Sequence, residues 1–120
     1  MADRVLFISW GQVVRAREER ALEVFNEALA LYARMQQDGR IEGFDVVILE
    51  PSSGLGGYIE IHGTATQLAT LTEEGDWRQL IADSALVVDD LKIARGATNA
   101  GVAQEIAVFQ EATAKVPQLA

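Results

Sequence analysis

The chain has 120 residues, of which 49% are hydrophobic, contains no cysteine, and carries a formal net charge of −8 at pH 7. This length supports one domain with its own core, and the lack of cysteine excludes disulfides, zinc–thiolate sites and thiol nucleophiles, which fits a cytoplasmic protein. The acidic balance disfavours nucleic acid and membranes as partners, and no apolar run approaches the roughly 20 residues that cross a bilayer. Residues 1–4 show no basic start of a signal peptide.

Hydrophobic periodicity predicts strand, helix, strand and strand in the first half of the chain. Both alternating sets of residues 5–14 are largely apolar, which is typical of a strand buried on both faces. A helical repeat follows over residues 16–38 and ends at Gly39. Two more strands are expected at residues 41–50 and Gly57–Gly63. The apolar stripe of the first helix is predicted to be Leu22, Phe25, Leu29, Tyr32 and Met35.

The following segment predicts a second helix and a last strand. Thr64 and Gln67 have the spacing of a capping box, which opens a helix over residues 67–82. Gly75 interrupts that helix. Alternating residues over 86–95 then indicate the last strand.

A C-terminal helix is expected over about residues 99–116, with Asn99 as its N-cap. The preceding order, β-α-β-β-α-β, is ferredoxin-like: two helices cover one face of a four-stranded antiparallel sheet, which is an α+β fold. We therefore predict a single domain over residues 1–120, with its core at residues 5–95.

Two helices leave the second face of such a sheet uncovered. In the second strand, Phe44 and Val46 alternate with Val47 and Leu49, so both faces of the strand carry apolar side chains. The apolar area of such a face is larger than the apolar patch that monomers usually expose. We expect it to pack on the same face of a second chain, giving a homodimer to which the C-terminal helix can contribute.

The βαββαβ stretch over residues 5–95 resembles the dimeric α+β barrel superfamily of small ferredoxin-like proteins. That group includes antibiotic-biosynthesis-type monooxygenases, YCII-like proteins and muconolactone-isomerase-like enzymes. Residues 73–80 resemble the broken second helix that is common in these proteins. The resemblance implies a dimeric barrel but transfers no catalytic residue. A YCII-like site needs a His–Asp pair, and His62 is the only histidine, with no aspartate identified as its partner.

Three side chains of the third strand form the best candidate site. Alternation places Tyr58, Glu60 and His62 on the face opposite Ile59 and Ile61, and hence in the dimer cleft if the isoleucines face the helices. A histidine beside a carboxylate is a workable acid–base pair. His62 would be the base, and Glu60 would orient it.

Neighbouring strands are expected to add ligand-binding residues to the same cleft. Trp10 and Gln12 could border it from the first strand, and Asp90 and Lys92 from the far side of that strand. The alternative is that these are satisfied polar groups at a dimer interface. Tyr58 and Trp10 would supply flat apolar walls with polar tips.

Glu60 and His62 also offer two metal ligands from one strand face. A third ligand could come from Asp45, Asp89 or Asp90, but the spacing secures none of them. The sequence therefore predicts no metal site and no cofactor.

Three functional interpretations remain open at this level. The first is a small-molecule binding protein that uses the cleft on the open sheet face. The second is a cofactor-independent monooxygenase or isomerase that acts on a small hydrophobic or aromatic acid. The third is a dimeric interaction scaffold. Fold alone does not decide among them, because this architecture supports unrelated activities.

Overall fold

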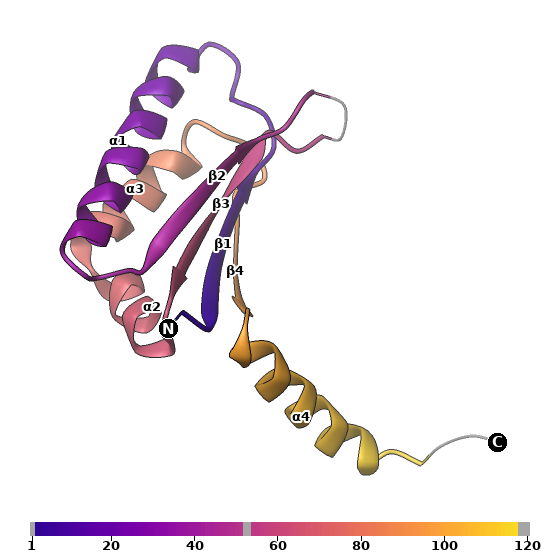
Figure 1. The fold of residues 1–120 in the computed structure, drawn as a ribbon. Coiled ribbons are helices and arrows are strands. Elements are labelled where there is room, and N and C mark those ends of the chain that lie inside the picture. The colour runs from indigo at the N-terminus through magenta and orange to yellow at the C-terminus, as the bar shows by residue number, and fades with distance from the viewer. Residues whose placement is uncertain (1, 52–53, 118–120) are drawn as a thin grey trace.

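The structure is a computed structural model that describes residues 2–51 and 54–117. Its elements are β1 (Arg4–Trp10), α1 (Glu18–Gln37), β2 (Gly43–Ile48), β3 (Gly57–Gly63), α2 (Ala65–Glu73), α3 (Gly75–Ala85), β4 (Lys92–Ala97) and α4 (Ala100–Ala114). The strands form one antiparallel sheet in the order β2-β3-β1-β4, with α1, α2 and α3 on one face (Figure 1). The predicted ferredoxin-like α+β fold is confirmed.

The core lies between the sheet and these three helices. Leu6 and Ile8 of β1 and Ile59 and Ile61 of β3 point toward the helices and are buried. Each such side chain contributes roughly 1.5–3 kcal/mol when it leaves water. The largest fully buried side chains are Tyr32, Leu6, Met35, Ile41, Ile61 and Leu71.

The predicted start and break of the second helix are both confirmed. The Gln67 amide donates to Thr64 Oγ1 at 3.1 Å, and the Thr64 amide donates to Gln67 Oε1 at 2.9 Å. Glu74 is extended, with φ −73° and ψ 139°, and separates α2 from α3. Arg40 holds this break, because its guanidinium donates to the carboxylates of Glu74 and Asp76.

The first and last strands differ most from their predicted boundaries, and β2 is two residues shorter at each end than predicted. The first strand ends at Trp10, and the chain beyond it meets residues 87–89 through single backbone hydrogen bonds and an isolated bridge from Val13 to Val88. The last strand begins at Lys92 rather than at residue 86. Asp90 has φ +56°, so the chain turns there before the regular ladder starts.

The stripe of α1 is also rotated from the predicted one. Leu22 is 62% exposed, whereas Val24 and Ala28 are buried. Tyr32 and Met35 are buried as predicted. The face of α1 that is turned toward the sheet therefore carries small side chains, and the large Leu22 side chain stays at its edge.

The capping role predicted for Asn99 is wrong. Asn99 has φ +49°, and its side-chain amide donates to the Ala2 carbonyl at 2.9 Å. No side-chain cap therefore forms at the start of α4. The side chain ties the helix start to the N-terminal segment instead.

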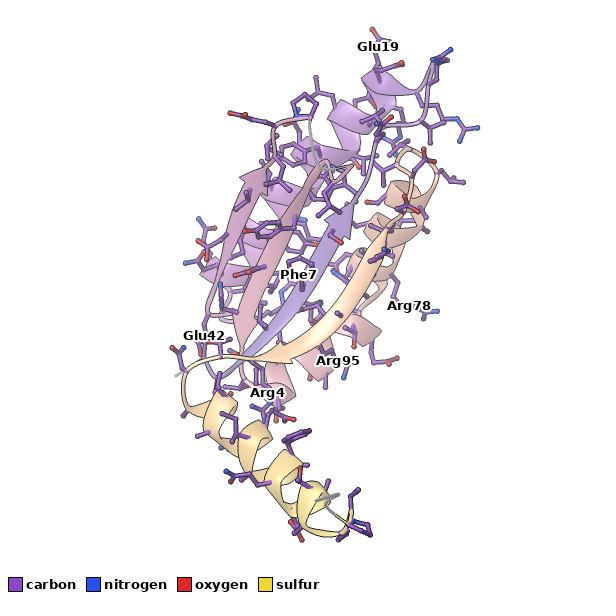
Figure 2. The ribbon with its side chains drawn as sticks, turned by 90° about the vertical axis from the view of Figure 1, so that its right-hand side faces the viewer. Arg4, Phe7, Glu19, Glu42, Arg78 and Arg95 are labelled. Atoms are coloured by element: carbon purple, nitrogen blue, oxygen red, sulfur yellow. The ribbon has the colours of Figure 1, made fainter. Side chains whose placement is uncertain are left out.

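The second face of the sheet is not covered by any helix within residues 2–51 and 54–117. Figure 2 looks onto this open face, with Phe7 near its centre. The rings of Phe7 and Tyr58 lie 5.1 Å apart, and both side chains are half-buried, as are Val5 and Val47. The open face therefore carries a band of apolar side chains across three strands.

Helix α4 projects away from this body (Figure 1). Gly101 is its one buried residue, and Phe109 is 71% exposed. The radius of gyration is 17.0 Å, against about 14 Å for a compact chain of this length. The exposed large apolar residues of α4 and the turn after it are Val102, Ile106, Val108, Phe109 and Val116. Within the described ranges, no helix is long and apolar enough to span a bilayer.

Burial raises the pKa of Tyr32 well above its usual value of about 10. The folded state keeps this phenol protonated, whereas the unfolded chain releases the proton above about pH 10, so stability falls as the pH rises further. We expect Tyr32→Phe to reduce this loss by up to about 1.4 kcal/mol per pH unit, measured by urea unfolding between pH 9 and 11. Equal slopes in the wild type and the variant would contradict the prediction.

Candidate functional site

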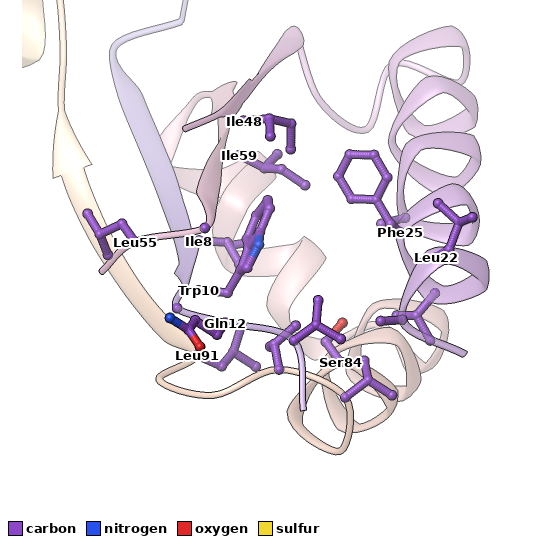
Figure 3. Close-up of a pocket in the computed structure, with 18 of the residues that line it drawn as sticks. Ile8, Trp10, Gln12, Leu22, Phe25, Ile48, Leu55, Ile59, Ser84 and Leu91 are labelled. Atoms are coloured by element: carbon purple, nitrogen blue, oxygen red, sulfur yellow. The ribbon is translucent and has the colours of Figure 1, made fainter. Parts of the chain in front are cut away.

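A cavity of about 640 Å³ lies between the sheet, α1 and α3 (Figure 3). Ile8 and Ile59 line it from the sheet, and Phe25 and Leu22 line it from α1. Leu55, from the β2–β3 connection, lies beside the sheet end (Figure 3). The volume of the cavity falls within the roughly 300–1,000 Å³ range of small-molecule pockets. We call this cavity the helix-side pocket.

Trp10 is the central aromatic side chain of the helix-side pocket. Its ring meets Phe25 edge-on, with ring centroids 6.1 Å apart. The end of the β2–β3 connection lies against this residue: the Gly56 amide donates to the Trp10 carbonyl at 2.8 Å. A Cβ at Gly56 would lie 2.7 Å from Trp10 Nε1, and one at Gly57 would lie 2.9 Å from Trp10 Cζ2. These two glycines therefore allow the backbone to close against the indole.

The polar groups of the helix-side pocket are few. Among its described lining residues, Glu18 is the only one with a formal charge, and no lysine or arginine takes part. The Glu18 carboxylate accepts a hydrogen bond from the Ala16 amide at 2.9 Å. The Ser84 hydroxyl donates to the Leu80 carbonyl at 2.8 Å, which leaves its oxygen as an acceptor. The lining therefore favours uncharged ligands over anions.

A second cluster lies on the open face, where β2 and β3 pair. Asp45 stands directly opposite Glu60 in the ladder, and His62 follows on the same face of β3. His62 Nε2 lies 2.9 Å from Asp45 Oδ2 and 3.7 Å from Glu60 Oε2. The His62 side chain is 26% exposed, that of Glu60 36% and that of Asp45 71%. We call these three residues the open-face cluster.

The structure separates residues that the sequence analysis placed in one cleft. Tyr58, Glu60 and His62 share the open face, but Trp10 and Gln12 line the helix-side pocket, so the prediction that they border the same cleft is wrong. The reason is parity: Trp10 has the same orientation in β1 as the buried Leu6.

The predicted contribution of Asp90 to this cleft is wrong, because Asp90 precedes β4, in the turn beside Gly11. Lys92 does lie on the open face: it pairs with Ser9, which pairs on its other side with Tyr58. His62 pairs with Val5, further along β1, so Lys92 shares a row with Tyr58 and not with the histidine.

The main residues that sequence reasoning missed are Asp45 as the partner of His62, and Phe25, Leu22 and Ser84 as pocket residues. A signal for Asp45 exists in the sequence, since two adjacent strands joined by one connection must pair in some register. That register depends on how the connection folds, and its length alone leaves several possibilities.

The sequence matches no protein-family model and no curated protein. Solved structures share its fold. A dimeric protein of unknown function and ferredoxin-like fold from Bacteroides fragilis has 10% identity and a TM-score of 0.60, and the match covers 79% of this chain and 96% of that one. SnoaB, a cofactor-independent oxygenase from Streptomyces nogalater, has 14% identity and a TM-score of 0.57, over 82% and 93% of the two chains. A hydroxynitrile lyase from Passiflora edulis has 8% identity and a TM-score of 0.63, over 82% and 96%. At these identities the likeness shows the fold alone.

The packing of Trp10 gives a direct test of the site geometry. Gly56→Ala places a methyl group against the Gly11 carbonyl oxygen and 2.7 Å from Trp10 Nε1, so the loop and the indole must shift apart. We expect the free energy of unfolding to fall by about 1–3 kcal/mol in urea titrations, with a shift in tryptophan emission. Gly43→Ala is the matched control, because a Cβ there meets no atom within 4 Å. The packing would be looser than described if the two variants behaved alike.

Proposed function

We propose that this protein binds a small, uncharged and largely apolar molecule in the helix-side pocket. The observation that carries the proposal is a cavity of about 640 Å³ with aromatic walls from Trp10 and Phe25. A few convergent polar groups in such a cavity typically fix the orientation of a ligand, and Ser84 and Gln12 are placed for that role. Because Glu18 is the one charged lining residue described, an aromatic acid fits less well than a neutral ring compound.

The protein works, in this proposal, as a homodimer joined through the open face. Phe7, Tyr58 and Val47 form an apolar band there, and burying such a band is the main source of association free energy. The Bacteroides fragilis protein with this fold is itself dimeric. Helix α4 also packs on the partner in this arrangement, because that contact removes its exposed apolar side chains from water.

A second candidate is cofactor-independent chemistry on the open face. It is supported by the 2.9 Å contact between His62 and Asp45 and by the shared fold of the oxygenase SnoaB. His62 would act as the base, oriented by Asp45 and Glu60, with Tyr58 as a wall of the dimer cleft. Trp10 plays no part in this candidate, since it lies on the other side of the sheet. The two candidates therefore occupy opposite faces and can be tested separately.

Ligand binding is tested with N-phenyl-1-naphthylamine, a neutral fluorescent probe. We expect saturable binding at about one probe per chain, and Leu22→Asp should weaken it at least about tenfold, because a charge at the rim opposes entry of an apolar ring. Ala30→Asp introduces the same charge into α1 at an exposed position outside the pocket and should bind like the wild type. Non-saturable binding, or equal losses in both variants, would refute the pocket assignment.

The proposed dimer is tested by light scattering on a sizing column. The wild type should elute as a dimer, and Phe7→Asp should elute as a monomer, because a carboxylate cannot be buried unpaired in an apolar interface. Val47→Asp tests the same face from β2, in case the Phe7 variant unfolds. Ala30→Asp should remain dimeric. A monomeric wild type, or dimeric forms of both open-face variants, would refute the arrangement.

A further inference from the structure

The open-face cluster holds three metal-ligating side chains around one point. The Nε2 atom of His62 and one oxygen each of Asp45 and Glu60 all lie within 4.8 Å of one another. We propose that these residues bind a divalent transition-metal ion of the Zn²⁺ type. The proposal does not depend on the helix-side pocket, which lies on the other face of the sheet, and each chain holds all three ligands.

The spacing of the ligand atoms suits such an ion. Zn²⁺ binds imidazole nitrogen and carboxylate oxygen at about 2.0–2.2 Å, so tetrahedral ligand atoms lie roughly 3.3 Å apart. The distances from His62 Nε2 are 2.9 Å to Asp45 and 3.7 Å to Glu60, on either side of that value. Small side-chain rotations are therefore enough to close the site on an ion.

The sheet supplies the rigidity that a metal site needs. Asp45 and Glu60 are cross-strand partners, and His62 stands two residues further along the same face of β3. The Glu42 amide donates to the His62 carbonyl at 2.8 Å and continues the ladder past the histidine. Ligands on paired strands are positioned more accurately than ligands on loops.

The negative charge of the open-face cluster favours a bound cation. Two carboxylates directly opposite one another on adjacent strands repel, and both of these approach the same nitrogen of His62. Apart from His62, the side chain on the described open face that can carry a positive charge is Lys92. It pairs with Ser9, well away from His62 along the sheet. A divalent ion balances the two carboxylate charges, which matters more once a partner chain covers the face.

The donor set selects the class of ion. One imidazole and two carboxylates suit Zn²⁺, Mn²⁺ or Fe²⁺, whereas Ca²⁺ and Mg²⁺ take oxygen ligands. Three protein ligands also leave one position for water or another ligand, as in catalytic rather than structural zinc sites.

The test uses the full chain, stripped with EDTA and titrated with Co²⁺ as a spectroscopic probe. We expect about one Co²⁺ per chain, visible d–d bands that report nitrogen and oxygen ligation, and displacement of the bands by Zn²⁺. His62→Asn should remove the bands. Asp45→Asn, at a side chain that is 71% exposed and so safe for folding, should weaken binding at least about tenfold.

Glu42→Gln is the matched control, since it removes one exposed carboxylate near His62 and leaves the backbone hydrogen bond between the two residues in place. It should bind Co²⁺ like the wild type. The proposal is overturned if the wild type takes up no stoichiometric Co²⁺, if His62→Asn keeps the bands, or if Glu42→Gln loses as much affinity as Asp45→Asn. Probe binding in the same EDTA-treated protein reports on the helix-side pocket independently, so failure of one proposal is distinguishable from failure of the other.

Discussion

The alternation of side chains along β1 is the constraint on which the rest of the structure depends. Leu6, Ile8 and Trp10 point toward the helices, while Phe7 and Ser9 point the other way. Because β1 pairs with both β3 and β4, its parity decides which residues of those strands meet the helices. A shift of one residue would bury Glu60 and His62 in the core and expose Ile59 and Ile61. The cost of burying those polar groups excludes that arrangement.

The same alternation gives the two faces of the sheet different chemistry. The helix side holds the core and, at the end where β1 stops, a pocket whose walls are aromatic and aliphatic. The open face holds an apolar band with one cluster of ionisable groups at its β2–β3 side. A ligand in the helix-side pocket is therefore screened from His62 by the sheet itself. Any function that combined Trp10 with His62 would need groups from both sides of one backbone layer.

The apolar content of the chain exceeds what its own core uses. Helix α4 leaves large side chains in solvent, and the open face leaves more. Both surfaces lie on the same side of the molecule, away from α1 and α3 (Figure 1). A second copy that packs on the open face would cover the band and come within reach of α4, which removes apolar area from water at two places together.

The sequence by itself determined the order of the elements, the ferredoxin-like class, the capping box at Thr64, the break near Gly75 and the common face of Tyr58, Glu60 and His62. These features depend on local periodicity and on turn and cap residues, which are readable over a few positions. Only the tertiary structure decided that Asp45 stands opposite Glu60, that Trp10 meets Phe25, and that β4 starts at Lys92. Each of these depends on strand register or on helix packing, which join residues far apart in the chain and are set by the whole core rather than by any local pattern.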